Sequence, residues 1–392
     1  MERRSNVTPD PDRYAELAAS LIDRGELGFS PPGASPTTVR GPAFPAWLAL
    51  GMLAGGRGPG WISFWSSVPG LIAAAVIFFV LHRSHGRRAA LVGGLLCAVH
   101  PLSCFVSARV LPDEFYGALL LLGLVSIGDT PLFSYKAVSG ELCKKKGSVP
   151  YVNAAIAGVF LSVAALTRAT AGLVMVAVVV GALVVKPRRV LVAMTITLMG
   201  LVILGAWTLR TSALVGKPAF VESLAGYNFW LGEAADRYGF ATGFGQARER
   251  AHELMAAEAG TTETRSPSFY YGALGPPEAH ELNERLSHAA VKLVEAAPLH
   301  YLRRCVAGLF WFWVRAETAT RTFQYALVAL PLVLLGLWGL WRTGPGTVLF
   351  AVIAHLAIYA AICPMARYSV QLYPLLCYLA GTVFVIREPE FF

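Results

Sequence analysis

Long apolar runs alternate with short polar connectors from residue 61 to the C-terminus. Each run is nearly free of charged residues and approaches the roughly 17–25 residues that a helix needs to cross a bilayer. A soluble protein would need one very large core to bury all of these runs. The pattern therefore predicts an all-α polytopic membrane protein with about nine transmembrane helices, at residues 61–81, 89–108, 115–131, 152–167, 170–185, 190–209, 323–341, 347–363 and 370–386.

Two polar stretches divide the chain into four parts. Residues 1–60 are rich in proline and glycine and hold no signal peptide, which predicts an external loop with juxtamembrane helices. Apolar residues recur at helical spacing over 278–297 and stop at Pro298, before the aromatic-rich stretch LFWFWVRAE. We therefore expect an ordered external cap on the membrane. The parts are the external loop at 1–60, transmembrane helices at 61–209, the helical cap at 210–322 and C-terminal transmembrane helices at 323–392.

Composition agrees with a membrane protein. The 392 residues are 55% hydrophobic and 15% charged, and the mean hydropathy is +0.55. The formal net charge of +9 does not indicate a nucleic-acid partner, because the basic residues form short clusters between apolar runs instead of one basic face. Membrane lipids are the expected surroundings. The six cysteines are scattered among apolar residues and read as small hydrophobes.

The basic clusters set the orientation. If nine helices alternate in direction, all clusters lie on one side, which the positive-inside rule makes the cytoplasmic one. The other side receives residues 1–60, the long loop and three turns, at Asp113–Glu114, Leu166–Arg168 and Pro364–Tyr368. The clusters are Arg83, Arg87 and Arg88, then Lys144 to Lys146, then Lys186, Arg188 and Arg189, and finally Arg342 and Arg387.

The N-terminal tail conflicts with this topology, because about sixty polar residues would have to reach the outside with no helix ahead of them. The simplest explanation is that a first helix is missing. We therefore expect that Met1 is an internal or misassigned start and that the natural protein begins with one more transmembrane span.

Two adjacent carboxylates, Asp113 and Glu114, stand between two apolar runs. A charge near the bilayer centre costs at least about 2.5–3.5 kcal/mol, so both belong at a helix end that faces water or a protein cavity. Two interpretations stay open. The pair solvates a tight turn at Pro112 and favours the start of the next helix, or it lies in an external cleft and binds a metal, a cationic group or substrate hydroxyls.

A second acidic pair, Asp10 and Asp12, precedes a helical pattern that begins at Tyr14. An aspartate at this place is often only a helix N-cap. The topology puts the pair on the same face as Asp113 and Glu114, however, which favours a shared site.

Two arginines are expected on that face. Arg168 interrupts an apolar run from Val152 to Val184, which predicts two short helices that meet there. Such an arginine either extends to the membrane interface or points inward as a phosphate partner, which its planar fork suits. Arg367 presents the same alternatives.

Taken together, these stretches resemble the GT-C superfamily of integral-membrane glycosyltransferases, in its protein mannosyltransferase-like and aminoarabinose-transferase-like branch. The resemblance continues in order through HPLSCFVSARVLPDEFYGALL, GVFLSVAALTRATAGLVM, FVESLAGYNFWLGEA, EAAPLHYLRRCVAGLFWFW and ARYSVQLYPLLCYLAG. The chain departs from the family in its missing first helix and in Glu233, where relatives commonly have asparagine. The first external loop of the family is matched by Asp10, Tyr14, Ala18, Leu21, Gly25, Arg40, Pro42 and Pro45.

The resemblance implies a transferase with a polyprenyl-phosphate-linked sugar as donor and a lipid, glycan or protein as acceptor. It implies an inverting transfer of a hexosyl or pentosyl group on the external face. An external aspartate would act as general base towards the acceptor hydroxyl, a role worth about 10²–10⁴-fold. Asp10 is the first choice for this base and Asp12 is its nearest rival.

The other candidates take supporting roles in this scheme. Asp113 and Glu114 would position the acceptor, and a divalent cation held by Asp10, Asp113 and Glu114 is left open. Arg168 and Arg367 would stabilise the charge that gathers on the departing phosphate. No nucleotide-binding fingerprint is evident, which agrees with a lipid-linked donor. The secondary candidates are Tyr14, Arg40 and Tyr368.

Two other functions stay open, a polytopic membrane transporter and a catalytically inactive membrane partner. A transporter usually shows internal repeats around a site at mid-depth, whereas the charged residues here collect at one face. The low lysine content and the Ala/Val/Gly richness favour a bacterium of high GC content, and hence the bacterial cytoplasmic membrane with an active site facing outside.

Overall fold

The computed structural model describes most of the chain, and the described part is helical without a β-strand. Each of the nine apolar runs is mostly helical over its described residues, with a break at His100 in the second run and non-helical residues at the ends of the eighth and ninth. The ends of the third and ninth runs, at 128–131 and 386, lie outside the described residues. The described ranges are 10–29, 36–127, 150–185, 190–222, 224–237, 243–258, 267–316, 318–344 and 346–385.

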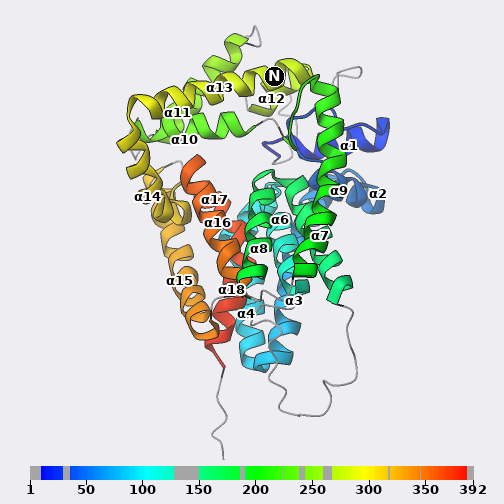
Figure 1. Ribbon diagram of the computed structural model, residues 1–392, viewed down its shortest axis with the longest axis vertical. Coiled ribbons are helices and arrows are strands. Elements are labelled where there is room, and N and C mark those ends of the chain that lie inside the picture. The colour runs from blue at the N-terminus through cyan, green and yellow to red at the C-terminus, as the bar shows by residue number, and fades with distance from the viewer. Residues whose placement is uncertain are drawn as a thin grey trace, which may run out of the picture.

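A bundle of helices along the long axis forms the body of the protein (Figure 1). Pro101 ends one of its helices and starts the next, so that α4 and α5 meet at an angle of 41°. The bundle helices are α3 (Pro59–His85), α4 (Arg87–Val99), α5 (Pro101–Ala108), α6 (Asp113–Ile127), α7 (Pro150–Thr167), α8 (Thr170–Val185), α9 (Val190–Val215), α15 (Ala319–Thr343), α16 (Thr347–Ile362), α17 (Ala366–Ser369), the 3₁₀ helix η3 (Val370–Leu372) and α18 (Tyr373–Val383).

The lengths of these helices agree with a multi-pass membrane protein. In the described part, α3, α9 and α15 are each long and apolar enough to cross a membrane, and the bent pair α4–α5 is a fourth candidate if it counts as one span. The apolar helices α2 (Ala43–Gly55), α7, α8 and α16 are shorter. The number of nine spans stays a prediction.

Helices from the long loop form a cap over one end of the bundle. Figure 1 shows α10, α11 and α13 lying crosswise above the bundle, while α14 runs down towards α15. Helix α13 covers the predicted segment 278–297 except for Ala297, and it buries Leu282 and Leu286 as the helical spacing requires. The cap helices are α10 (Ala225–Arg237), α11 (Gly243–Glu258), α12 (Pro267–Ala273), α13 (Pro276–Ala296) and α14 (Pro298–Val314).

The described basic connectors lie at the end of the bundle away from the cap. The α3–α4 connection carries Arg83, Arg87 and Arg88 and is at the lower end in Figure 1. Arg342 closes α15 and donates to the carbonyl of Val383 at 2.8 Å, which joins the ends of α15 and α18. The other predicted clusters lie outside the described residues, namely Lys144 to Lys146, Lys186, Arg188, Arg189 and Arg387.

Candidate active site

Arg168 lies in the break between α7 and α8, as the interrupted apolar run predicts. Its side chain is 8% exposed and its Nη2 lies 3.0 Å from Oδ1 of Asp113. The guanidinium carbon is 5.1 Å from the centre of the Tyr368 ring, a distance that allows a cation–π contact. Arg168 therefore points into the protein and does not extend to the membrane interface.

Asp113 begins α6 and is fully buried. Its Oδ1 accepts a hydrogen bond of 2.6 Å from Nε2 of Gln371, in addition to the ion pair with Arg168. Its Oδ2 accepts one of 3.0 Å from Nε of Arg367. Both carboxylate oxygens thus have charged or polar partners, as a buried carboxylate requires.

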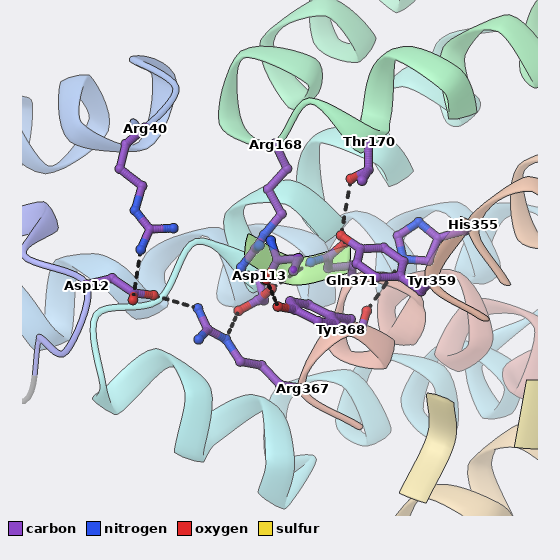
Figure 2. A network of polar contacts seen from close by, with 11 residues as sticks. Asp12, Arg40, Asp113, Arg168, Thr170, His355, Tyr359, Arg367, Tyr368 and Gln371 are labelled. Atoms are coloured by element: carbon purple, nitrogen blue, oxygen red, sulfur yellow. Dashed lines mark hydrogen bonds and ion pairs between the residues drawn. The ribbon is translucent and has the colours of Figure 1, made fainter. Parts of the chain in front are cut away.

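Arg367 joins the two acidic stretches of the sequence. While its Nε donates to Asp113, its Nη2 donates to Oδ2 of Asp12 at 2.9 Å. The other oxygen of Asp12 accepts from Nη2 of Arg40 at 2.9 Å. Figure 2 shows the resulting chain of alternating charges, which we name the arginine–carboxylate network: Arg40, Asp12, Arg367, Asp113 and Arg168.

The charges in this network control the ionisation of Asp12. Burial alone would raise the pKa of Asp12, but the guanidinium groups of Arg40 and Arg367 outweigh burial. They hold the pKa of Asp12 well below its ordinary value, so the carboxylate is ionised at neutral pH.

A close backbone approach brings the N-terminal segment to this place. A side chain at Gly41 would collide with the carbonyl oxygen of Leu166, at the end of α7. Only glycine allows that approach, and it sets Arg40 beside the break that carries Arg168. Tyr14 supports the same segment, because its ring lies edge-on to Phe44 at 5.1 Å and 5.2 Å from the guanidinium of Arg40.

Asp10 is not part of the network, although it is the preferred base in the sequence-based scheme. Its Oδ2 accepts a hydrogen bond of 2.6 Å from the backbone N–H of Ala15, at the start of α1 (Tyr14–Arg24). Asp10 thus binds a first-turn N–H of α1, although the N-cap residue itself is Arg13. Burial raises its pKa to about 6, against the lowering effect of the backbone hydrogen bonds.

Glu114 also turns away from the network. It follows Asp113 on α6, and consecutive helical side chains point about 100° apart. Its Oε2 accepts a hydrogen bond from Ser107 on α5, and a side chain at Gly70 of α3 would collide with it. Glu114 lines a separate cavity between α3 and α5.

Aromatic and amide groups tie the network to the cap. The ring of Tyr368 stacks on that of Tyr359 at 4.6 Å, and its hydroxyl donates to Oδ1 of Asn228 on α10 at 3.3 Å. The hydroxyl of Tyr359 donates to Oε1 of Gln371 at 3.1 Å, the amide that holds Asp113 (Figure 2). Asn228 and Gln371 lie in the stretches quoted for the resemblance, but nothing in their spacing marks them as site residues.

A cavity of about 400 Å³ opens against the network, below the cap. Asp12 is the one carboxylate among its described lining residues. The apolar wall of the cavity includes Leu102, Phe105, Leu231 and Met365. The arginines that line the cavity are Arg40, Arg168 and Arg367 together with four that the sequence did not mark, Arg109, Arg248, Arg315 and Arg321. A lining of arginines and apolar side chains favours an anionic ligand with an apolar part.

The four additional arginines had only weak signals in the sequence. Arg109 stands just before the acidic turn, and Arg315 and Arg321 flank the end of the aromatic-rich stretch. Arg248 lies on α11, in a cap helix that the sequence analysis did not delimit. All of them are on the predicted external face, so the topology alone could have made them candidates.

A divalent cation finds no suitable set of ligands in the described residues. No group of three or more His, Cys, Asp or Glu side chains is placed there to hold a metal ion. Asp10, Asp113 and Glu114 each face different partners, as described above. Glu233 has a different environment again, since it is buried in the cap and pairs with Nε of Arg304 at 2.7 Å.

No protein-family model and no curated protein matches the sequence. Among the solved structures that resemble the fold over nearly the whole chain are the following two. ArnT from Cupriavidus metallidurans, bound to undecaprenyl phosphate, is 16% identical, with a TM-score of 0.44, over 96% of this chain and 73% of that one. The oligosaccharyltransferase AglB from Archaeoglobus fulgidus, in complex with an inhibitory peptide and a dolichol-phosphate, is 15% identical, with a TM-score of 0.51.

The match with AglB covers 94% of this chain and 45% of that one. At such low identity the likeness concerns the fold alone. It confirms the predicted all-α architecture, and the fold is like that of AglB.

Proposed function

We propose that the chain is a glycosyltransferase of GT-C type that transfers a sugar from a polyprenyl-phosphate donor to an acceptor hydroxyl. The arginine–carboxylate network beside a cavity with an apolar wall is the observation that carries this proposal. Guanidinium groups bind phosphate through two parallel hydrogen bonds. The apolar wall suits the first isoprene units of a lipid chain.

The reaction follows from the groups that face the cavity. The acceptor oxygen attacks the anomeric carbon, and its new bond forms as the bond from that carbon to the phosphate oxygen breaks. The bonding electron pair leaves with the phosphate, where Arg367 and Arg168 stabilise the additional negative charge. The acceptor proton passes to a carboxylate. A single displacement of this kind inverts the anomeric carbon, whether the sugar is a hexose or a pentose.

Asp12 is the carboxylate that we assign as general base. It lines the cavity, whereas Asp10 accepts a hydrogen bond from the backbone at the start of α1 and Glu114 lines a different cavity. Asp113 lies behind Asp12 in the network and has two arginines and one amide as partners. It positions both arginines instead of accepting the proton.

The cavity is lined in part by the cap helices α10 and α11. These helices are at the end of the bundle away from the α3–α4 connection, which carries Arg83, Arg87 and Arg88 (Figure 1). By the positive-inside rule this end faces outward. We therefore place the reaction on the external face of a bacterial cytoplasmic membrane. The acceptor is a lipid, glycan or protein that reaches this face.

Mass spectrometry of envelope glycans tests the proposal. Cells that lack the gene should lose one sugar substituent, and the wild-type gene should restore it. Asp113→Asn should fail to restore it at normal protein level, because it removes the charge that holds Arg168 and Arg367. Asp23→Asn, which alters an exposed pair with Arg57, is the matched control and should restore it fully. Unchanged glycans after deletion, or full restoration by Asp113→Asn, would contradict the proposal.

A further inference from the structure

The carboxylate of Asp12 holds two of the arginines that line the cavity. Each of its oxygens takes one guanidinium, from Arg40 and from Arg367, at 2.9 Å. The phosphodiester of the proposed donor offers the same two contacts from its two non-bridging oxygens and carries one negative charge, as a carboxylate does. The polyprenyl phosphate that the reaction releases is a monoester, and its charge exceeds that of a carboxylate. The carboxylate and a lipid phosphate cannot both take these donor hydrogens.

Of the two carboxylates in the network, Asp12 is the one that can move. The Asp113 side chain is fully buried and has three partners, whereas the Asp12 side chain is 14% exposed and lies in the turn before α1. Arg367, its partner, is 28% exposed. A phosphate that enters the cavity therefore reaches the Asp12 side of Arg367 while Asp113 keeps the other side.

We propose that the Asp12 carboxylate occupies the phosphate position of the donor, and that the donor phosphate displaces it from Arg40 and Arg367. This inference rests on the proposed function. Before the donor binds, the Asp12 carboxylate competes with the lipid phosphate for Arg40 and Arg367. After the phosphate has bound, this carboxylate is free. Donor binding then precedes activation of the acceptor.

Electrostatics supports this order of events. Burial is the largest influence on the pKa of Asp12 and raises it, and only the guanidinium groups hold that pKa low. Once phosphate neutralises Arg40 and Arg367, burial dominates and the pKa of Asp12 rises. The carboxylate becomes a better proton acceptor only when a donor is in place.

Binding of farnesyl phosphate to the purified full chain in detergent tests the inference, with farnesol as the uncharged control probe. Asp12→Asn removes the competitor and should bind farnesyl phosphate about tenfold more tightly than the wild type, a change of 1.4 kcal/mol. Asp12→Glu keeps the charge and should stay within about threefold of the wild type. Asp23→Asn is the matched control for loss of an aspartate and should not alter the affinity.

Infrared difference spectroscopy provides a second measurement on the unaltered chain. Farnesyl phosphate should change the environment of one carboxylate, and farnesol should change none. Equal or weaker binding by Asp12→Asn, or no carboxylate change in the wild type, would overturn the inference while leaving the proposed function intact. Absence of phosphate-dependent binding in both the wild type and Asp12→Asn would overturn the proposed donor class and this inference together.

Discussion

The protein has two pairs of neighbouring acidic residues, Asp10 with Asp12 and Asp113 with Glu114. The two members of each pair lie in different environments. Asp12 and Asp113 join the arginine–carboxylate network beside the cavity. Asp10 and Glu114 are held by uncharged donors, the backbone of Ala15 and the hydroxyl of Ser107. Proximity in the sequence therefore does not put two carboxylates in one site. The position of the arginines separates the functional acids from the structural ones.

The largest expected effect is at Asp12. Asp12→Asn should lower the rate of sugar transfer about 10³-fold, because the amide cannot accept the proton of the acceptor. The measurement is the initial rate at which purified protein in nanodiscs releases polyprenyl phosphate from a polyprenyl-phosphate-linked sugar. A rate within threefold of the wild type would remove Asp12 from the reaction.

The second-largest effect is expected at Arg367, the arginine that contacts both Asp12 and Asp113. Arg367→Lys keeps the charge but loses the fork that serves Asp12 and Asp113 together, so the same rate should fall about 10–100-fold. Arg57→Lys, in an exposed pair with Asp23, is the matched control and should leave the rate unchanged. If both lysine variants behave alike, the fork geometry at Arg367 has no role.

Asp10→Asn and Asp12→Asn should change the unfolding temperature of the chain in opposite directions. The pKa of Asp10 in the folded chain is about 6, above the ordinary value of 3.8. Above pH 6 the folded chain thus keeps a buried charge that costs about 3 kcal/mol, and the cost disappears as the pH falls from 6 to 3.8. Asp10→Asn should therefore raise the unfolding temperature at pH 8 but not near pH 4.

Asp12 has a lowered pKa, so its contribution has the other sign. The stability that it provides is present above pH 3.8 and is lost as the pH falls through its folded pKa. Asp12→Asn should lower the unfolding temperature at pH 8. Thermal unfolding of both variants across this range measures the contrast, and shifts of the same sign would contradict it.

The smallest effect is expected at Glu114. Gln at this position still accepts the hydrogen bond from Ser107, so Glu114→Gln should change the transfer rate by less than about twofold. Asp113→Asn on the neighbouring residue is the comparison, since it leaves Arg168 and Arg367 without their shared carboxylate. A large loss of activity in Glu114→Gln would place the second cavity in the reaction.

Much of the architecture could be predicted from the sequence because periodicity and topology are local signals. The helix break at Arg168, the helix that begins at Tyr14 and the cap helix before Pro298 all follow from such signals. The alternation of helices also placed distant residues on one face. That Asp12, Asp113, Arg168 and Arg367 are all near one another agrees with this topology.

The direction of individual side chains could not be predicted. Asp10 and Asp12 flank Pro11, and Arg13 has a φ of 59° in the left-handed region, so the backbone there follows no regular period. Which aspartate meets Arg40 depends on the approach of Gly41 to Leu166, a contact between distant segments. The arginines of the cap, such as Arg248, are brought to the cavity only by tertiary packing.

The rate ratio between Asp10→Asn and Asp12→Asn tests the central claim most directly, because the two changes are chemically identical and two residues apart. Both purified proteins are given the same polyprenyl-phosphate-linked sugar and acceptor, and released polyprenyl phosphate is counted by mass spectrometry. We predict that Asp10→Asn keeps at least about a third of the wild-type rate while Asp12→Asn keeps about a thousandth. Equal rates for the two variants, or a greater loss in Asp10→Asn, would contradict the account.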